Sequence, residues 1–77
     1  MKNSDLLLFN LAINFAKGNY AQKTPETILT LMGFTPLESR TISNNNGYII
    51  RTEYLLLTGE IVVVKRLAKN RQKATLK

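Results

Sequence analysis

The apolar residues near the start of the chain follow the pattern of a helix that is buried on most of its circumference. Nearly every residue of the segment 6–16 is apolar. Ser4 or Asp5 can cap the start of this helix, and Gly18 can end it in the left-handed conformation common at helix ends. The polar residues would share one narrow stripe and are Asn3, Asn10, Asn14 and Lys17. The pattern predicts a helix that ends near residue 17.

A second helix is predicted to begin at Thr24-Pro25-Glu26. Threonine is a favoured N-cap residue, proline is favoured at the first helical position, and an acidic residue suits the first turn. The apolar residues that follow are Ile28, Leu29, Leu31 and Met32. Gly33 is expected to end this helix.

The segment 35–43 carries signals for two different structures. Thr35 and Glu38 have the spacing of a capping box, which allows a short third helix over residues 36–42. The end of the segment instead has strand propensity, and Asn46-Gly47 beyond it is the strongest short hairpin signal. We favour a strand here, and the short helix stays open as the alternative.

Two more strands are predicted over residues 48–57 and 60–67, which are rich in leucine, β-branched and aromatic residues. A two-residue loop at Thr58-Gly59 would pair these strands and place Arg51 opposite Arg66. One face of this hairpin is then expected to join the core, and it holds Ile50, Tyr54, Leu56, Ile61, Val63 and Leu67.

The opposite face of the same hairpin is apolar near its turn, where it holds Leu55, Leu57, Val62 and Val64. An apolar patch of this kind invites association when it is exposed. Either the first helix covers it or another chain does, most simply in a symmetric homodimer. These residues are therefore the predicted partner or dimer interface.

The predicted fold class is α+β, with two N-terminal helices followed by a small antiparallel sheet of two or three strands in a meander. In the three-stranded version, a two-residue turn at Asn46-Gly47 places Arg40 opposite Glu53 as a cross-strand ion pair. Residues 1–68 would form one compact domain, and residues 69–77 a basic C-terminal tail.

The net charge of +6 is concentrated at the end of the chain. Residues 1–64 carry as many acidic as basic residues, so the body is neutral. The whole excess comes from Lys65, Arg66, Lys69, Arg71, Lys73 and Lys77. This asymmetry is typical of a basic arm that contacts a polyanion, although a solvated, frayed C-terminus has the same composition.

These six residues, together with Arg51, are the candidate nucleic-acid-binding site. If the tail were helical, Lys69, Lys73 and Lys77 would form one row whose mutual repulsion phosphates would relieve. Arg51 and Arg66 would extend the basic surface onto the hairpin, unless Glu53 merely neutralises them.

The composition argues against catalysis and metal binding. The chain has no Cys and no His, so it lacks disulfides, soft metal ligands and the usual general base. Its acidic residues fall in different predicted elements, and it has no glycine-rich phosphate loop. We expect no enzymatic activity, no cofactor, no metal and no small-molecule substrate.

The apolar N-terminal segment is too short to cross a membrane, which takes about 20 residues. Asp5, Asn10 and Asn14 also interrupt the pattern of a signal peptide. We expect no membrane partner and a cytoplasmic location.

The order of helix, helix, possible short helix and hairpin is similar to that of winged helix-turn-helix DNA-binding domains. Residues 25–32 and 36–42 would be the turn-linked helices, with Gly33-Phe34-Thr35 as the turn. The pattern departs from that family at the contact sites. The would-be recognition helix has one Arg beside an acid, and the would-be wing tip at residues 57–60 is apolar and acidic. The resemblance therefore concerns the order of elements alone.

Two functions follow as expectations. In the first, the protein is a small non-catalytic nucleic-acid-binding regulator of DNA or RNA, with the basic arm supplying phosphate contacts. In the second, it is a protein-binding module or inhibitor, as in phage- or plasmid-type accessory proteins. Its hydrophobic hairpin or open edge strand would then bind the partner, and the tail would meet an acidic protein surface.

Overall fold

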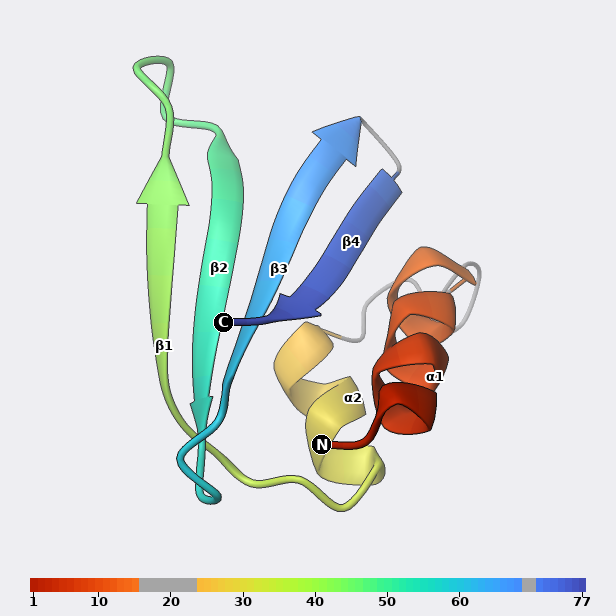
Figure 1. The fold of residues 1–77 in the computed structure, drawn as a ribbon. Helices are drawn as coiled ribbons and strands as arrows, with labels where there is room; N and C mark the ends of the chain where they lie inside the picture. Colours follow the sequence, from red (N-terminus) through yellow and green to blue (C-terminus); the bar gives the residue numbers. More distant parts are fainter. Residues whose placement is uncertain (16–23, 69–70) are drawn as a thin grey trace.

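The computed structural model describes residues 1–15, 24–68 and 71–77. Two helices precede a four-stranded antiparallel sheet whose strand order follows the chain, β1-β2-β3-β4. The fold class is therefore α+β, as predicted, and Figure 1 shows both helices beside one end of the sheet. The elements are α1 (Asn3–Phe15), α2 (Pro25–Leu31), β1 (Pro36–Ser43), β2 (Ile49–Leu56), β3 (Ile61–Ala68) and β4 (Arg71–Leu76).

The second helix begins as the sequence predicts, whereas the first begins at Asn3, ahead of the predicted caps Ser4 and Asp5. Its predicted end near residue 17 lies outside the described residues. The carboxylate of Asp5, in the first turn of α1, accepts a hydrogen bond from the backbone N–H of Lys2 at 3.1 Å. Thr24 caps α2 by accepting a hydrogen bond from the N–H of Thr27 at 3.2 Å, and Pro25 follows it at the first helical position. These contacts satisfy backbone donors that have no partner inside a helix.

The end of α2 forms a Schellman motif. Gly33 has a φ of +93°, and its N–H bonds to the carbonyl of Thr30 at 3.0 Å. The N–H of Phe34 bonds to the carbonyl of Leu29 at 2.9 Å. This pair of bonds satisfies two of the last helical carbonyls, so the chain leaves α2 in a fixed direction toward β1.

The segment that carried two signals is a strand. Residues 36–43 form β1, the outer strand of the sheet next to β2 (Figure 1). The short third helix is absent from this segment. The order of elements in winged helix-turn-helix domains therefore does not apply to this chain.

The pairing of β1 with β2 places Arg40 opposite Glu53, as predicted, although the turn between the strands differs from the prediction. The carbonyl of Asn44 accepts from Gly47 N–H at 3.0 Å, and Asn44 N–H donates to Tyr48 at 2.8 Å, which closes a three-residue loop. An irregularity next to Ile42 then shifts the register by one residue. The shift offsets the longer loop and restores the predicted register, although the predicted Arg40–Glu53 ion pair is not formed and Glu53 pairs with Arg51 and Lys77 instead.

The pairing of β2 with β3 differs by one residue from the prediction. The N–H of Leu56 donates to the carbonyl of Glu60 at 2.9 Å, so the loop has three residues and ends in Gly59 with a φ of +91°. Tyr54 therefore lies opposite Val62, and Arg51 lies opposite Lys65 rather than Arg66. Because side chains alternate between the two faces of a strand, this shift reverses both faces of β3.

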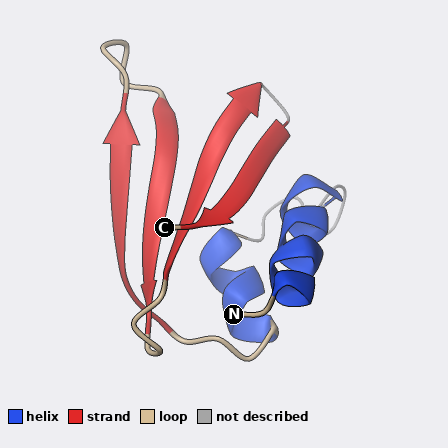
Figure 2. Ribbon diagram, viewed as in Figure 1, coloured by secondary structure: helices blue, strands red, loops and turns tan. Residues whose placement is uncertain are grey.

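The core lies between the helices and one face of the sheet, and Figure 2 shows the helices grouped on one side of the strands. The predicted core face was right for β2 and wrong for β3. Ile50 and Leu67 are 40% and 50% exposed, and Ile61 and Val63 lie on the opposite face, half-buried. The buried residues are Phe9, Ile13, Ile28, Leu29, Tyr54, Leu56, Val62, Val64 and Ala74.

The first helix is less buried than its sequence suggested. Phe9 and Ile13 face the core, but the other side of α1 is an exposed apolar stripe. The exposed residues of this stripe are Leu7, Leu8, Leu11 and Phe15. The prediction that most of the circumference is buried was therefore wrong.

The segment predicted to be a basic tail includes a fourth strand. Residues 71–76 form β4, which pairs antiparallel with β3, and Ala74 of this strand is buried. The sheet thus has four strands rather than two or three. No free arm is seen over the described residues 71–77.

The outer edge of β4 is hydrogen-bonded to α1 through two asparagine side chains. Asn10 donates to the carbonyl of Ala74 at 2.9 Å and accepts from its N–H at 2.8 Å. Asn14 makes the same pair of bonds with Gln72, at 2.7 and 2.8 Å. Asn10 and Asn14 of the predicted polar stripe therefore face this strand and satisfy the backbone groups that an edge strand leaves unpaired, whereas Asn3 is exposed and Lys17 lies outside the described residues.

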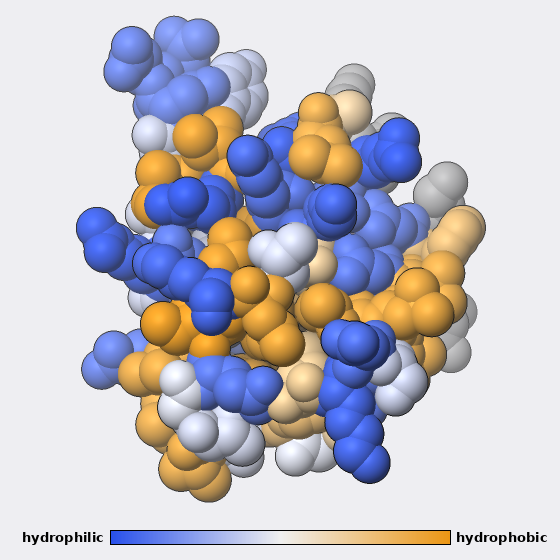
Figure 3. Space-filling model, viewed as in Figure 1, coloured by the Kyte–Doolittle hydropathy of each residue, from blue (hydrophilic) through white to orange (hydrophobic). Residues whose placement is uncertain are grey.

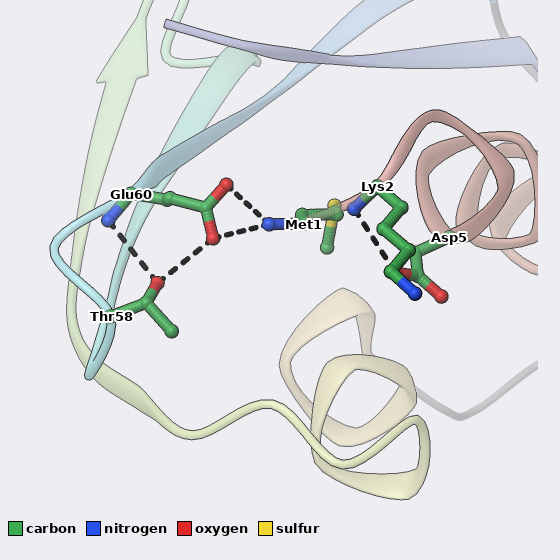
Figure 4. A network of polar contacts seen from close by, with 5 residues as sticks. All are labelled: Met1, Lys2, Asp5, Thr58 and Glu60. Carbon is green, nitrogen blue, oxygen red and sulfur yellow. Dashed lines mark hydrogen bonds and ion pairs between the residues drawn. The ribbon is translucent and has the colours of Figure 1, made fainter.

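The start of the chain is fixed to the turn between β2 and β3. The amino group of Met1 forms an ion pair with the carboxylate of Glu60, and Thr58 donates to the same carboxylate at 3.0 Å (Figure 4). These contacts lower the pKa of Glu60, chiefly through the hydrogen bond from the amino group.

Neither helix in the described segments combines the length and the hydropathy that a bilayer crossing requires.

Candidate functional site

The face of the sheet that points away from the helices carries basic residues from all four strands, and we call it the open face. Register places on it the residues that alternate with the buried ones. In the view of Figure 3, hydrophilic and apolar residues are interspersed over the strands. The charged side chains of the open face are Glu38, Arg40, Arg51, Glu53, Lys65, Lys73 and Lys77.

Three basic residues stand in one row across the open face. Arg51 of β2 lies directly opposite Lys65 of β3, and Lys65 lies directly opposite Lys73 of β4. Neighbouring strands are about 4.8 Å apart, so the row spans roughly 10 Å. Like charges in directly opposed positions destabilise a sheet. The row is therefore an arrangement that an external anion would relieve.

Glu53 organises two of the neighbouring cations. One oxygen of its carboxylate lies 3.2 Å from Arg51 Nη2, and the other accepts a hydrogen bond from Lys77 Nζ at 3.1 Å. The hydrogen bond from Lys77 is the largest cause of the lowered pKa of Glu53, and the charges of Lys77, Arg51 and Arg40 lower it further against partial desolvation. Glu53 is thus a carboxylate held between cations.

Lys65 and Lys73 differ from Arg51 and Lys77 in having no carboxylate beside them. Within the described residues, neither lysine takes part in an ion pair, and both side chains are exposed. Arg51 Nε is buried and has no hydrogen-bond partner in the described part of the chain. The row therefore keeps donors and positive charge that its protein neighbours do not satisfy.

Apolar side chains lie beside the charges on the open face. A shallow hollow is lined by Val63 and Leu67 together with Lys65, Lys73 and Lys77. Leu55 and Ile61 line a second hollow next to β1. Among the residues of the four strands, Tyr54 is the only aromatic residue and it points into the core, whereas the exposed Tyr48 lies in the turn between β1 and β2. The surface suits phosphate contact rather than base stacking.

The structure gathers four of the predicted nucleic-acid-binding residues on one surface, namely Arg51, Lys65, Lys73 and Lys77. Arg66 lies on the helix side of the sheet, where it lines a cleft with Pro25, Thr52 and Gln72. Arg71 is exposed at the start of β4. Lys69 lies outside the described residues.

The predicted partner interface is divided between the two faces of the sheet. Val62 and Val64 are buried under the helices, whereas Leu55 and Leu57 lie outside the core. The physical reason is the three-residue loop, which shifts β3 by one position and turns its other face outward. These four residues therefore do not form one surface.

Arg40 belongs to the open face but was absent from the predicted site. It is exposed, lies opposite Glu53 and lowers the pKa of that carboxyl group. The sequence signal was present, because the predicted register already placed Arg40 beside Glu53. The strand β4 could not be added to the predicted sheet, because its segment carries no strand signal in the sequence.

The described residues contain no group of acidic, His or Cys side chains arranged to hold a metal ion. Comparisons with protein-family models, with curated proteins and with solved structures each found no match to this chain.

Proposed function

We propose that this protein is a small non-catalytic nucleic-acid-binding protein of a regulatory kind, and that the open face of its sheet contacts the phosphate backbone. The observation that carries the proposal is the aligned row of Arg51, Lys65 and Lys73. The contact surface is a strand-built face rather than a C-terminal arm.

The charge pattern favours an anion that extends over several contacts. Arg51 supplies a planar guanidinium that suits bidentate phosphate contact, and the two lysines add point charges along the row. Lys77 and Arg40 lie in the neighbouring rows, on either side of Glu53. A nucleic-acid backbone presents regularly spaced phosphates and can engage several of these groups at once.

Binding of this kind is expected to depend weakly on sequence and strongly on salt. Contacts to phosphate carry no base information, and the residues of the four strands place no aromatic side chain on the open face. Release of counterions makes the logarithm of affinity fall linearly with the logarithm of salt concentration.

The test is a fluorescence-anisotropy titration of labelled duplex DNA, single-stranded DNA and RNA at several salt concentrations. We compare the full wild-type chain with the Lys65→Gln/Lys73→Gln variant. The variant should bind more weakly, and its salt slope should be smaller by about two phosphate contacts.

Lys2→Gln is the matched control because it removes an exposed positive charge that lies just before α1, away from the open face. It should leave the affinity almost unchanged. Failure of the wild type to bind all three ligands near physiological salt would refute the proposal. An equal loss per removed charge in Lys2→Gln and in Lys65→Gln/Lys73→Gln would reduce it to nonspecific attraction by net charge.

A protein-binding module is the second candidate function, and the exposed apolar stripe of α1 favours it. Leu7, Leu8 and Phe15 are 63%, 55% and 72% exposed. Exposed apolar patches of this kind commonly mark interaction sites. This candidate requires a protein complex that Leu8→Gln/Leu11→Gln abolishes and that Lys65→Gln/Lys73→Gln leaves intact.

A further inference from the structure

The two edge strands of the sheet, β1 and β4, differ in whether their outer backbone groups have hydrogen-bond partners. The edge of β4 is closed by the asparagine side chains of α1. The edge of β1 lies at the far side of the sheet from α1, and no described element pairs with its outer backbone (Figure 1). An unpaired edge strand is a template for another strand.

The hydrogen-bonding pattern shows which backbone groups of β1 point outward. At the end of β2, the N–H of Leu56 donates to the carbonyl of Glu60 on the β3 side. The N–H of the next residue, Leu57, donates to the carbonyl of Thr35 on the β1 side. The backbone groups of successive residues in a strand point to alternate sides. The N–H and C=O of Glu53 therefore point toward β1, where Glu53 lies opposite Arg40. The N–H and C=O groups of Ser39 and Thr41 consequently face away from the sheet.

The charges of β1 complement themselves in one register. If two copies of β1 run antiparallel with Ser39 opposite Ser39 of the second copy, Glu38 of each copy lies opposite Arg40 of the other. Both side chains are exposed and neither makes an ion pair with the described residues of its own chain. Glu38–Arg40 pairs would then occupy non-hydrogen-bonded positions, where opposed Cα atoms are about 4.5 Å apart.

The two adjacent registers that use the same outward groups lack this complementarity, and a pair centred on Thr41 opposes Arg40 with Ile42 and makes no ion pair. Centring the pair one position later places Arg40 opposite Arg40, and centring it one position earlier places Glu38 opposite Glu38. Both put like charges in direct opposition, which is unfavourable. The stretch from Glu38 to Ile42 is also the part of β1 without register irregularities.

We propose that β1 pairs with β1 of a second copy of this chain, in the antiparallel register centred on Ser39 and fixed by two reciprocal Glu38–Arg40 ion pairs. The contact is isologous, as a two-fold symmetric dimer requires. It joins two four-stranded sheets into one continuous sheet of eight strands. The proposal stands independently of the proposed function.

The dimer has a consequence for ligand binding, and this consequence alone rests on the proposed function. Paired residues of an antiparallel sheet point to the same side, so the open faces of both copies adjoin. The two basic rows would then present one surface to a single nucleic acid. Two linked sites bind more tightly than one when the ligand spans both.

Sedimentation velocity over a range of concentrations tests the pairing directly, with no ligand present. We compare the wild type with Glu38→Arg, Arg40→Glu and the double variant Glu38→Arg/Arg40→Glu. Each single change places like charges opposite each other in both pairs and should weaken the dimer at least about tenfold. The double variant restores opposite charges with reversed polarity and should recover the dimer.

Every outcome decides the question. A wild-type chain that stays monomeric at its highest soluble concentration overturns the proposal. A dimer that Glu38→Arg leaves unchanged overturns the register, since a pair centred on Arg40 does not oppose these two residues. Loss of the dimer in Leu8→Gln/Leu11→Gln, with the charge variants unaffected, assigns the contact to α1 instead. Urea unfolding of each variant verifies that it is folded.

Anisotropy titrations of the dimerisation variants separate the two proposals. A monomeric Ser39→Pro chain, which loses the outward N–H of Ser39 but keeps every charge of the open face, would retain the proposed function without its joined surface if it still binds nucleic acid with the salt slope of one basic row. A dimeric wild type that binds no nucleic acid would retain the pairing and refute the function.

Discussion

Asn10 of α1 and Ala74 of β4, which lie 64 residues apart in the sequence, are joined through both backbone groups of Ala74. The amide of Asn10 donates to the carbonyl and accepts from the N–H, as a neighbouring strand would. Asn14 repeats this contact one helical turn later, at Gln72. Through these two side chains, α1 satisfies the backbone groups at the β4 edge that a further strand would otherwise satisfy, and it holds β4 in place.

Replacing Asn10 with Ala is expected to lower the free energy of unfolding by about 2 kcal/mol, because two partly buried backbone groups lose their partners. Urea unfolding measures the change. Asn10→Ala/Asn14→Ala should also expose the β4 edge and increase aggregation, which light scattering detects.

The matched control is Asn3→Ala, an exposed asparagine on the same helix. It should change the free energy of unfolding little. A similar loss in Asn3→Ala and Asn10→Ala would contradict the assignment to the contact with Ala74, because Ala is the better helix former at both positions and propensity alone predicts no loss.

We expect the row of like charges to lower the stability of the fold while it raises the affinity for nucleic acid. Lys65 stands between Arg51 and Lys73, so Lys65→Gln removes two repulsive cross-strand pairs. We expect this variant to be more stable than the wild type by roughly 0.3 kcal/mol at low salt. The gain should shrink as salt screens the repulsion, while nucleic-acid affinity falls. Urea unfolding at two salt concentrations measures both parts.

A decrease in stability for Lys65→Gln would contradict the view that the row is strained by its own charges. Lys2→Gln again serves as the comparison, because no basic residue lies opposite Lys2 in a strand pair. It should show little gain at either salt concentration.

The sequence predicted the two helices and the first three strands better than it predicted which side of β3 faces the core. Residues 61–64 are Ile-Val-Val-Val, so the strand is apolar at every position and its own pattern does not select a face. The choice depends on one residue of loop length, and Gly59 is compatible with either loop. The predicted interface failed for this reason, while Arg40 opposite Glu53 was confirmed.

The fourth strand was missed because its stability comes from distant residues. The segment 71–76 is mostly polar, and Ala74 is its one buried residue. What places it in the sheet is pairing with β3 and the contacts of Asn10 and Asn14, which local propensity does not record. The sequence therefore identified basic residues of the candidate site but placed them on a tail rather than on a strand.

The depressed pKa of Glu53 predicts a loss of stability in acid. Folding lowers this pKa below its ordinary value of 4.5, chiefly through the hydrogen bond from Lys77. The stabilisation is therefore present above the unfolded pKa and is lost as the pH falls through the folded pKa. Glu60, whose pKa is also lowered, adds to the same loss.

Urea unfolding between about pH 5 and pH 3 should show a shallower decline for Glu53→Gln than for the wild type. Lys77→Gln should have a similar effect, because it removes the main cause of the shift. Lys73→Gln removes a charge from the same strand without touching Glu53 and should keep the wild-type slope. Identical slopes in all four proteins would show that Glu53 does not contribute to the acid transition.

The loop between β2 and β3 provides a test of backbone conformation alone. Gly59 has a φ of +91°, and a Cβ built on it would meet nothing within 4 Å. Gly59→Ala should therefore lower the free energy of unfolding by about 1 kcal/mol through backbone strain. Gly59→Asn should cost less because asparagine tolerates the left-handed region, and Gly59→Val should cost more because its β-branched side chain does not. Urea unfolding gives the order, and equal costs for Ala, Asn and Val would contradict a conformational cause.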